Sequence, residues 1–411
     1  MRILFLAHFI PHPPTGGASL RNYNIVKELA KTNDVHLVTF SQRDRHPTRE
    51  RIEQSRRVLA EFCREVTIVD VPTDYSRLKW YALLAFNTFS AAPYSAWRFW
   101  SKEMVAVLNR TLERHQFDVV HVDTIALAGY HQYLRGLPAV LNHHNVESSL
   151  LLRRSAIEKS PAARWYVRQQ GNKLRAAEIA ALTTYDGNIA VSELDRQELL
   201  SYAPGARVVE IPNGTDTEFF HPDETTPPTT SLVFAGSMAW YPNSDAMILF
   251  GEKIWPLIKA EVPEVVMNLI GSRAPEAVLR LAENDPQFRT LGFVDDVRPT
   301  IAAAAVYVVP IRVGGGTRLK ILDAMAMGKA IVSHPIGAEG LDVRDGHDIV
   351  IAEAPEEFAR RVIDLIRDPE RRKQLATNAR QSVMKKYAWG IIVPRLVEFY
   401  REVAARDARR G

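Results

Sequence analysis

The stretch Val308-Val309-Pro310-Ile311-Arg312-Val313-Gly314-Gly315-Gly316-Thr317-Arg318-Leu319-Lys320 joins an apolar strand to a helix through three consecutive glycines. Glycines let backbone N–H groups approach an anion without a Cβ in the way, and the first turn of a helix offers unpaired donors at its positive end. Thr317 is a good N-cap, while Arg318 and Lys320 add positive charge. The junction predicts a diphosphate site, with an ordinary strand-to-helix turn as the alternative.

The helix predicted over residues 317–329 adds a carboxylate to this junction. Leu319, Leu322 and Ala326 form its apolar stripe, and Gly328 is placed to end it. Asp323 lies three residues after Lys320. It either accepts hydrogen bonds from ribose hydroxyls or forms a surface ion pair with Lys320.

Outward from this junction, short β-branched runs alternate with helical patterns along the whole chain, which predicts an α/β protein with doubly wound parallel sheets. The polar, proline-containing segment 223–230 is expected to link a first domain, 1–222, to a second, 223–388. The strands are expected near residues 3–6, 35–39, 66–69, 119–122, 139–141, 188–191 and 208–211, and then near 232–234, 265–270, 289–291, 306–310, 330–333 and 349–351.

Ligands of such sheets bind beyond the carboxyl ends of the strands. Gly16 and Gly17 follow the first expected strand but lack the G-x-G-x-x-G pattern, so nicotinamide binding has little support. His143 and His144 follow the strand near 139–141, where they are either structural groups or functional ones.

These features resemble the retaining, GT-B-fold glycosyltransferases of glycosyltransferase family 4. The resemblance covers nearly the whole chain and includes His144-Asn145-Val146-Glu147, Pro212-Asn213-Gly214-Thr215-Asp216, Phe234-Ala235-Gly236-Ser237 and the Gly-Gly-Gly-Thr-Arg segment. It implies two Rossmann-like domains that face each other across a cleft. The first would be the acceptor side and the second the nucleotide-sugar side, and a terminal helix of about 389–411 would pack back on the first.

The resemblance also implies residue roles. Arg318 and Lys320 would stabilise the β-phosphate as the sugar leaves, and His144 would act on the acceptor side as a catalytic group. Asp323 would hold the ribose, and Phe293 and Val294 would border the base. The remaining donor-binding residues would be Gly16, Gly17, Gly236, Ser237, Gly314, Gly315, Gly316 and Thr317.

Two positions depart from the family pattern. Gly315 stands where relatives carry the first of two glutamates, and Asp323 stands where they carry the second. The segment after Gly236 also lacks the Arg and Lys that many relatives use on the diphosphate, so Arg318 and Lys320 are expected to take over that charge.

Composition favours a large enzyme without a metal. The chain has 411 residues, 46% of them hydrophobic, which is enough for two cores. The single Cys63 excludes an internal disulfide and fits the cytoplasm. The apolar opening reads as a strand rather than a signal peptide, and no apolar run is long enough to span a membrane. Neither H-E-x-x-H nor D-x-D is present, so we expect no metal and no cofactor apart from the nucleoside-diphosphate-sugar co-substrate.

The net charge of +4 comes from the N-terminal half. There, Arg164, Arg168 and Arg175 share a predicted helical stripe, which would face anionic lipid or simply solvent. Aromatic residues of the same half would form an interfacial belt or, more simply, pack between helices; they are Trp80, Tyr81, Phe86, Trp97, Phe99 and Trp100. No nucleic-acid-binding signature is present, so we expect no nucleic-acid partner.

The predicted function is transfer of a sugar from a nucleoside-diphosphate donor to a glycan or lipid-linked acceptor, with retention, in bacterial polysaccharide or glycolipid synthesis. The enzyme would be cytoplasmic, with a peripheral membrane contact as a further option. Two alternatives stay open: conversion of the sugar nucleotide itself, as in an epimerase, and a nucleotide- or glycan-binding paralogue without turnover, which Gly315 motivates.

Overall fold

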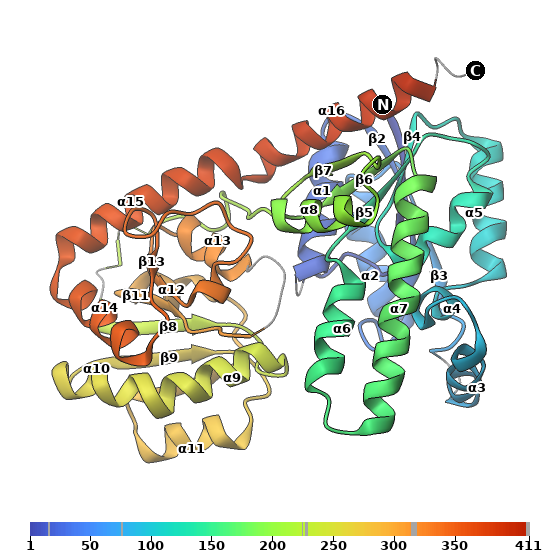
Figure 1. Cartoon of the computed structure of the whole chain (residues 1–411). Coiled ribbons are helices and arrows are strands. Elements are labelled where there is room, and N and C mark those ends of the chain that lie inside the picture. The colour runs from blue at the N-terminus through green and yellow to red at the C-terminus, as the bar shows by residue number, and fades with distance from the viewer. Residues whose placement is uncertain (15–16, 75–76, 224, 227–228, 314–318, 408–411) are drawn as a thin grey trace. The chain divides into compact units, whose positions relative to one another are not determined.

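A computed structural model describes the chain apart from residues 15–16, 75–76, 224, 227–228, 314–318 and 408–411. Its contacts divide the chain into two compact units (Figure 1): unit 1 comprises Met1–Pro212 with Ile392–Gly411, and unit 2 comprises Asn213–Ile391. The change of unit therefore precedes the polar segment expected as the linker. Residues just after Pro212 already bond within unit 2, since Arg380 donates to the carbonyl of Phe220 at 2.9 Å.

Unit 1 contains a seven-stranded parallel sheet in the order β3-β2-β1-β4-β5-β6-β7. Its strands are β1 (Arg2–Ala7), β2 (Asp34–Ser41), β3 (Glu65–Asp70), β4 (Val119–Val122), β5 (Ala139–His143), β6 (Gly187–Ala190) and β7 (Val208–Glu210). Its helices are α1 (Gly17–Ala30), α2 (Arg49–Ala60), α3 (Arg77–Phe89), α4 (Tyr94–Arg98), α5 (Lys102–Arg114), the 3₁₀ segment η1 (Ile125–Tyr133), α6 (Glu147–Ile157), α7 (Pro161–Thr184) and α8 (Glu193–Tyr202).

Unit 2 contains a six-stranded parallel sheet in the order β10-β9-β8-β11-β12-β13. Its strands are β8 (Ser231–Ala235), β9 (Val266–Ile270), β10 (Phe288–Gly292), β11 (Val306–Val309), β12 (Ala330–Ser333) and β13 (Val350–Ile351). Its helices are α9 (Tyr241–Leu249), the π segment η2 (Phe250–Ile254), α10 (Trp255–Glu261), α11 (Glu276–Asn284), α12 (Arg298–Ala303), α13 (Leu319–Ala326), the 3₁₀ turn η3 (Pro335–Gly337), α14 (Pro355–Arg367) and α15 (Pro369–Lys386).

The helix α16 (Trp389–Asp407) ends the described chain, and most of it belongs to unit 1. Tyr400 is buried there, and its hydroxyl lies 2.6 Å from Nδ1 of His121 on β4. Phe399 also packs against Gly187, where a Cβ would come within 2.6 Å of its ring. The C-terminal helix therefore contributes to the core of the N-terminal unit.

Both sheets form because their strands are apolar runs that can be buried on two faces, as parallel sheets require. Five of the six residues of β1 are buried, as are all four of β11. Each of the 13 strands expected from the sequence is present, so the predicted fold class is confirmed. Gly328 has a φ of +62° just after α13, which matches its predicted place at the end of that helix.

The strand order reverses at one point in each sheet: between β1 and β4 in unit 1, and between β8 and β11 in unit 2. Helices that follow the two central strands there leave in opposite directions, and a crevice opens beyond the strands' carboxyl ends. Ligands of doubly wound sheets bind at such switch points. The residues that follow β1, β4, β8 and β11 are therefore the first place to look for a site.

A helix that crosses a bilayer needs about 20 consecutive, predominantly apolar residues. Among the described residues, none of the helices combines the length and the apolar character that crossing a bilayer requires.

Candidate functional site: a histidine pair on one carboxylate, and a lysine beside a glycine

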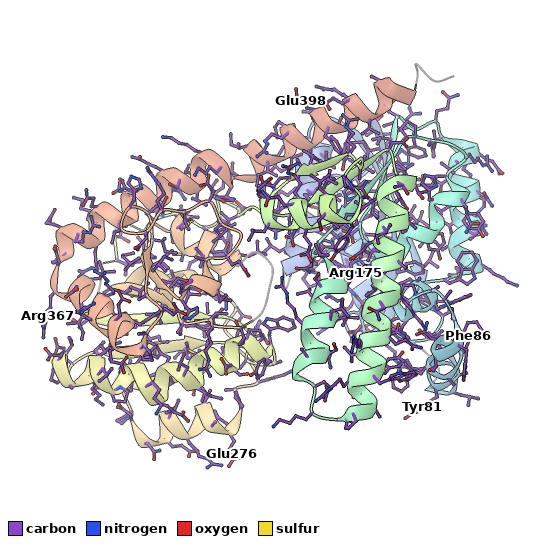
Figure 2. All side chains as sticks on the ribbon, in the orientation of Figure 1. Tyr81, Phe86, Arg175, Glu276, Arg367 and Glu398 are labelled. Atoms are coloured by element: carbon purple, nitrogen blue, oxygen red, sulfur yellow. The ribbon has the colours of Figure 1, made fainter. Side chains whose placement is uncertain are left out.

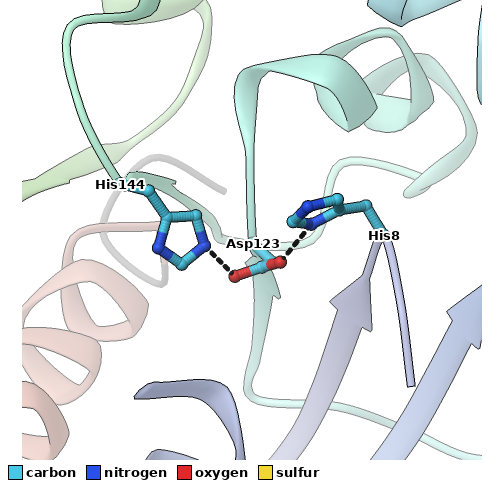
Figure 3. Close-up of side chains that lie close together, drawn as sticks. All are labelled: His8, Asp123 and His144. Carbon is cyan, nitrogen blue, oxygen red and sulfur yellow. Dashed lines mark hydrogen bonds and ion pairs between the residues drawn. The ribbon is translucent and has the colours of Figure 1, made fainter. Parts of the chain in front are cut away.

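At the switch point of unit 1, one buried carboxylate binds two imidazoles (Figure 3). Asp123 follows β4 and is fully buried. Its Oδ1 lies 2.7 Å from Nε2 of His144, which follows β5, and its Oδ2 lies 2.6 Å from Nδ1 of His8, which follows β1. Three loops at neighbouring strand ends thus meet on a single side chain.

The charge of Asp123 fixes which ring nitrogens carry protons. Burial opposes ionisation of this carboxyl, but the charges and hydrogen bonds of His144 and His8 outweigh it and hold the pKa of Asp123 well below its usual value. An ionised carboxylate only accepts, so Nε2 of His144 and Nδ1 of His8 must donate. Burial lowers the pKa of His8 despite the Asp123 contact, which keeps this imidazole neutral near pH 7.

This arrangement leaves a lone pair on Nε2 of His8 and, when His144 is neutral, on Nδ1 of His144. Each can accept a hydrogen bond from a substrate hydroxyl, as imidazoles oriented by a carboxylate do in other enzymes. His8 is 19% and His144 12% exposed at the side chain, so a ligand can reach both. The geometry suits a site that binds or deprotonates hydroxyl groups.

A buried polar network holds the carboxylate in place. The backbone N–H of Asp123 donates to Leu6 at 2.9 Å, and Asn142 donates to the Asp123 carbonyl at 3.1 Å. Arg21, on α1, donates to Asn142 at 3.3 Å and to the carbonyl of Pro212 at 2.8 Å. Burial lowers the pKa of Arg21 to about 10, so it remains a cation beside the Asp123 carboxylate. Such a supported network predicts a rigid site.

The same three groups could also hold a divalent cation. One ligand atom from each of His8, Asp123 and His144 lies within 4.8 Å of the other two. Two imidazoles and a carboxylate are common ligands of Zn²⁺. The expected absence of a metal therefore stays a prediction.

At the switch point of unit 2, Lys320 lies directly against Gly236. Gly236 follows β8, and a Cβ there would come within 2.4 Å of the Lys320 Nζ and 2.8 Å of Asn243 Nδ2. Lys320, on α13, donates to Asn243 Oδ1 at 2.7 Å and lies 3.9 Å from the ring centroid of Phe234. A Cβ at residue 236 would displace the ammonium from this position, so glycine lets Lys320 lie against the backbone here.

Asp323 lies one turn after Lys320, and its Oδ1 accepts a hydrogen bond of 2.7 Å from the Thr215 hydroxyl. Loss of solvent around the carboxyl, together with the charge of Asp216, raises its pKa to about 7, against the smaller effects of Thr215 and Lys320. The sequence predicts that this carboxylate contacts either a ribose or Lys320. In the structure its hydrogen-bond partner is Thr215, which belongs to the Pro212–Asp216 motif.

Replacing Asp323 by asparagine should change how stability depends on pH. A carboxyl with a raised pKa holds its proton in the folded state above pH 4, so its stabilising effect is full below about pH 4 and is lost as the pH rises to about 7. Asparagine keeps the oxygen that Thr215 contacts but does not titrate. Melting temperatures at pH 4.5 and 7.5 should therefore fall with pH more steeply in the parent than in Asp323→Asn. Parallel slopes would contradict the raised pKa.

Ser237, Phe293 and Val294, three further residues predicted to bind the donor, lie in loops near Gly236. Ser237 is exposed, and its carbonyl accepts from Asn243 at 2.8 Å, so it lies beside Gly236 and Lys320. The backbone N–H of Gly271 donates to the carbonyl of Gly292 at 2.8 Å, and a Cβ at Gly271 would come within 2.0 Å of the Gly236 carbonyl oxygen. This brings the loop of Phe293 next to that of Gly236. Phe293 is 74% exposed, as a base-stacking group would be, while Val294 packs against the core.

Of the predicted glycines near the strand ends, Gly17 is the first residue of α1 and is exposed. Gly16, Gly314, Gly315, Gly316, Thr317 and Arg318 lie outside the described residues.

Sequence reasoning missed Asp123 and His8 in unit 1, and Asn243 and Thr215 in unit 2. Asp123 follows the apolar run 119–122, so the rule that polar residues at strand ends bind ligands could have found it. His8 directly follows the apolar run of the first strand, so the same rule applies to it. Nothing in the local sequence marks Asn243 as a partner of Lys320.

Comparison with known proteins agrees with this architecture. The model of the family "Glycosyltransferase Family 4" matches residues 15–219, and that of "Glycosyl transferases group 1" matches residues 229–368. The chain is 26% identical over 343 residues to an alpha-maltose-1-phosphate synthase of Mycolicibacterium smegmatis, which covers 73% of this chain and 83% of the relative. It is 27% identical over 249 residues to a phosphatidyl-myo-inositol mannosyltransferase of Mycobacterium tuberculosis, which covers 54% of this chain and 61% of the relative.

Solved structures show the same fold. A sucrose-phosphate synthase from Thermosynechococcus elongatus superimposes with a TM-score of 0.71 at 16% identity, covering 99% of this chain and all of that one. The Anabaena protein HepE, solved with UDP and glucose, gives a TM-score of 0.67 at 15% identity and covers 98% of this chain and all of that one. With both domain models matched and both sheets in place, the chain belongs to the GT-B glycosyltransferases of family 4.

Proposed function

We propose that this glycosyltransferase moves a sugar from a nucleoside-diphosphate-sugar to a hydroxyl of a glycan or lipid-linked acceptor, with retention of anomeric configuration. The observation that carries the proposal is the placing of polar groups at both switch points: the pair of imidazoles on Asp123 in unit 1, and Lys320 beside Gly236 in unit 2. Relatives support the substrate classes, since HepE was solved with UDP-glucose and a mycobacterial relative is named as a mannosyltransferase of phosphatidyl-myo-inositol.

In this mechanism, unit 2 stabilises the leaving group. As the bond from the anomeric carbon to the diphosphate oxygen breaks, negative charge grows on the β-phosphate. Lys320 would meet that charge with a hydrogen bond of ~1.5–3 kcal/mol, and Arg318 is proposed to add a second. Asp323 would accept a hydrogen bond from the ribose, and Phe293 would stack on the base. Both roles follow from the family resemblance and from the positions given above.

In unit 1, His8 and His144 would accept hydrogen bonds from hydroxyls of the sugar or the acceptor. Retention requires the acceptor oxygen to form its bond on the face that the diphosphate leaves, so the departing phosphate oxygen is the natural acceptor of the hydroxyl proton. The imidazoles then orient the reactants rather than take that proton. If one of them were the base on the opposite face, the product would be inverted.

The test begins with thermal unfolding in the presence of UDP, GDP, ADP and CDP. A nucleotide at a hundred times its Kd should stabilise the folded protein by about 2.7 kcal/mol. The preferred nucleotide then fixes the sugar donors for turnover assays, and NMR of the product reads the anomeric configuration. A new sugar nucleotide formed from the donor alone would favour the epimerase alternative. Binding without turnover, for every donor and acceptor, would favour the inactive paralogue.

We also propose that unit 1 contacts acidic membranes through α3. Apolar side chains recur on one face of this helix at helical spacing: Leu78 is 79%, Tyr81 62%, Phe86 54% and Phe89 91% exposed. Asn87, on the other face, is buried and bonded to Gln170 and Lys173 of α7 at 2.7 and 2.5 Å. Figure 2 labels Tyr81 and Phe86 on this outer face. A helix fastened on one side with an exposed apolar stripe fits a membrane surface.

Two of the three arginines predicted to form a basic stripe on one helix are exposed near this surface. Arg164 and Arg168, on α7, are exposed and can meet lipid phosphates. Arg175 is half-buried. Its guanidinium lies 5.0 Å from the centroid of the Tyr202 ring and donates to the Tyr202 hydroxyl at 3.3 Å, so Arg175 is not part of an exposed basic stripe. Phe99 is buried, as packing between helices predicts, and Trp97 and Trp100 are half-buried. Trp80, Tyr81 and Phe86 are exposed.

Binding to vesicles checks this contact. The protein should sediment with vesicles that contain phosphatidylglycerol more than with neutral ones, and Tyr81→Ser with Phe86→Ser should lose most of that binding. Leu279→Ser is the matched control, because Leu279 is an exposed apolar residue on α11 of unit 2. Equal sedimentation of the parent and both variants would show that α3 does not contact the membrane.

A further inference from the structure

A second cluster of metal-ligand side chains lies at the opposite edge of the unit 1 sheet. His36 on β2 and Glu65 at the start of β3 are register partners across the two strands, and His115 follows α5 directly. One ligand atom of each of the three residues lies within 4.8 Å of the other two. Three segments far apart in the sequence therefore meet at the amino ends of β2 and β3.

The distances suit a tetrahedral metal. Glu65 Oε2 lies 3.5 Å from Nδ1 of His36 and 3.2 Å from Nε2 of His115. Zn²⁺ binds nitrogen and oxygen at ~2.0–2.1 Å, and tetrahedral angles then put neighbouring ligand atoms about 3.4 Å apart. Both distances from the Glu65 oxygen to an imidazole nitrogen are thus already close to the spacing that a shared metal ion would impose.

A second observation points to a missing partner. His36 is 3% exposed, and its Nδ1 has no hydrogen-bond partner among the described residues even though it lies beside a carboxylate. Buried polar atoms almost always have a hydrogen-bond partner, so a buried nitrogen without one indicates that a ligand is missing. A metal ion between Nδ1 and the Glu65 carboxylate would satisfy both groups.

The surroundings favour a structural or regulatory ion. Phe117 packs edge-on against the His36 ring, with centroids 5.1 Å apart, and holds its orientation. His36 is the register partner of Leu4, four residues before His8, so the cluster lies about 13 Å along the strands from the His8 position. A metal here would join β2, β3 and the end of α5 without touching the site described above.

We infer that His36, Glu65 and His115 bind a divalent transition-metal ion, with Zn²⁺ as the best match and water at the remaining position. Two imidazoles select Zn²⁺, Co²⁺ or Ni²⁺ over Mg²⁺ and Ca²⁺, which prefer oxygen ligands. The side chains of Glu65 and His115 are 41% and 32% exposed, which gives the metal a path and leaves room for water. Burial lowers the pKa of His36, as do the nearby charges of His115 and Arg2, so this imidazole is neutral and able to bind a metal near pH 7.

The experiment uses the full chain with His8→Gln and His144→Gln, because the first cluster also offers metal ligands. Zn²⁺ binding to this background is measured by competition with a chromogenic chelator, and Co²⁺ gives a visible absorption band only if the site is tetrahedral. One equivalent should bind. Adding His115→Gln or Glu65→Gln should weaken binding by at least about tenfold, since even the loss of an outer-shell partner typically costs that much.

The matched control is His221→Gln, since His221 is an exposed histidine of unit 2. It should bind Zn²⁺ like the background. Circular dichroism without metal shows whether each variant is folded. If His115→Gln does not fold, Glu65→Gln still tests the proposal. Micromolar Zn²⁺ that fails to bind the background, or binds equally to folded His115→Gln and Glu65→Gln variants, would overturn the inference.

Discussion

Replacing Asp123 by asparagine should lower sugar transfer by roughly 10²-fold while leaving the fold intact, because the imidazoles that orient the reactants would lose their alignment. Asparagine has the same shape, but its amide accepts on one side only and donates on the other. One of the two imidazoles must then turn its lone pair towards residue 123, so its outward nitrogen becomes a donor. The negative charge that stabilises any imidazolium is lost as well. Initial rates with the preferred donor, measured beside circular dichroism, check this expectation.

The pH profile separates this role from a structural one. The Asp123 carboxylate raises the pKa of His8 through its hydrogen bond and charge, against the larger lowering effect of burial. Removing the carboxylate should lower that pKa further, so the acid limb of the Asp123→Asn profile should move to lower pH. Asp118→Asn is the control, because Asp118 is an exposed aspartate of the same sheet that accepts from the backbone of Arg2. Parent-like transfer by a folded Asp123→Asn protein would exclude Asp123 from the reaction.

Replacing Lys320 by alanine should lower kcat/KM by roughly 10- to 150-fold, which is the loss of one charge-assisted hydrogen bond of ~1.5–3 kcal/mol to the diphosphate. The variant should also lose most of the thermal stabilisation by the nucleoside diphosphate. Binding of the nucleoside alone should change little, since the ammonium faces Gly236 and Asn243 rather than the loop of Phe293. Thermal shifts with nucleoside and nucleotide, side by side, measure this difference.

Stability must be followed at the same time, because Lys320 also packs on the Phe234 ring at 3.9 Å. A cation–π contact of this kind contributes ~0.5–2 kcal/mol. Lys253→Ala is the control, since Lys253 is an exposed lysine of the same unit. A Lys320→Ala protein that binds the diphosphate as tightly as the parent would show that the charge comes from elsewhere, with Arg318 as the next candidate.

The elements of the fold were predictable because parallel strands buried on both faces are short apolar runs. Those from β1 to β13 therefore appear where the sequence indicates them. His144 and Asp323 could be proposed as site residues from the sequence because they sit at a strand end and one turn into a helix. Their partners could not be. The Thr215 hydroxyl reaches Asp323 from 108 residues away, and no local pattern of either segment reveals that contact.

The class of protein can be derived from local features of the chain: alternating strands and helices, a glycine-rich junction with cations, and family motifs spread along its length. The order of the strands, by contrast, is seen only in the folded chain: β1 lies between β2 and β4, so His8 reaches the Asp123 carboxylate, 115 residues away, and shares it with His144. Periodicity records which side chains are buried, whereas strand order depends on packing between distant segments, which each strand's own residues do not encode.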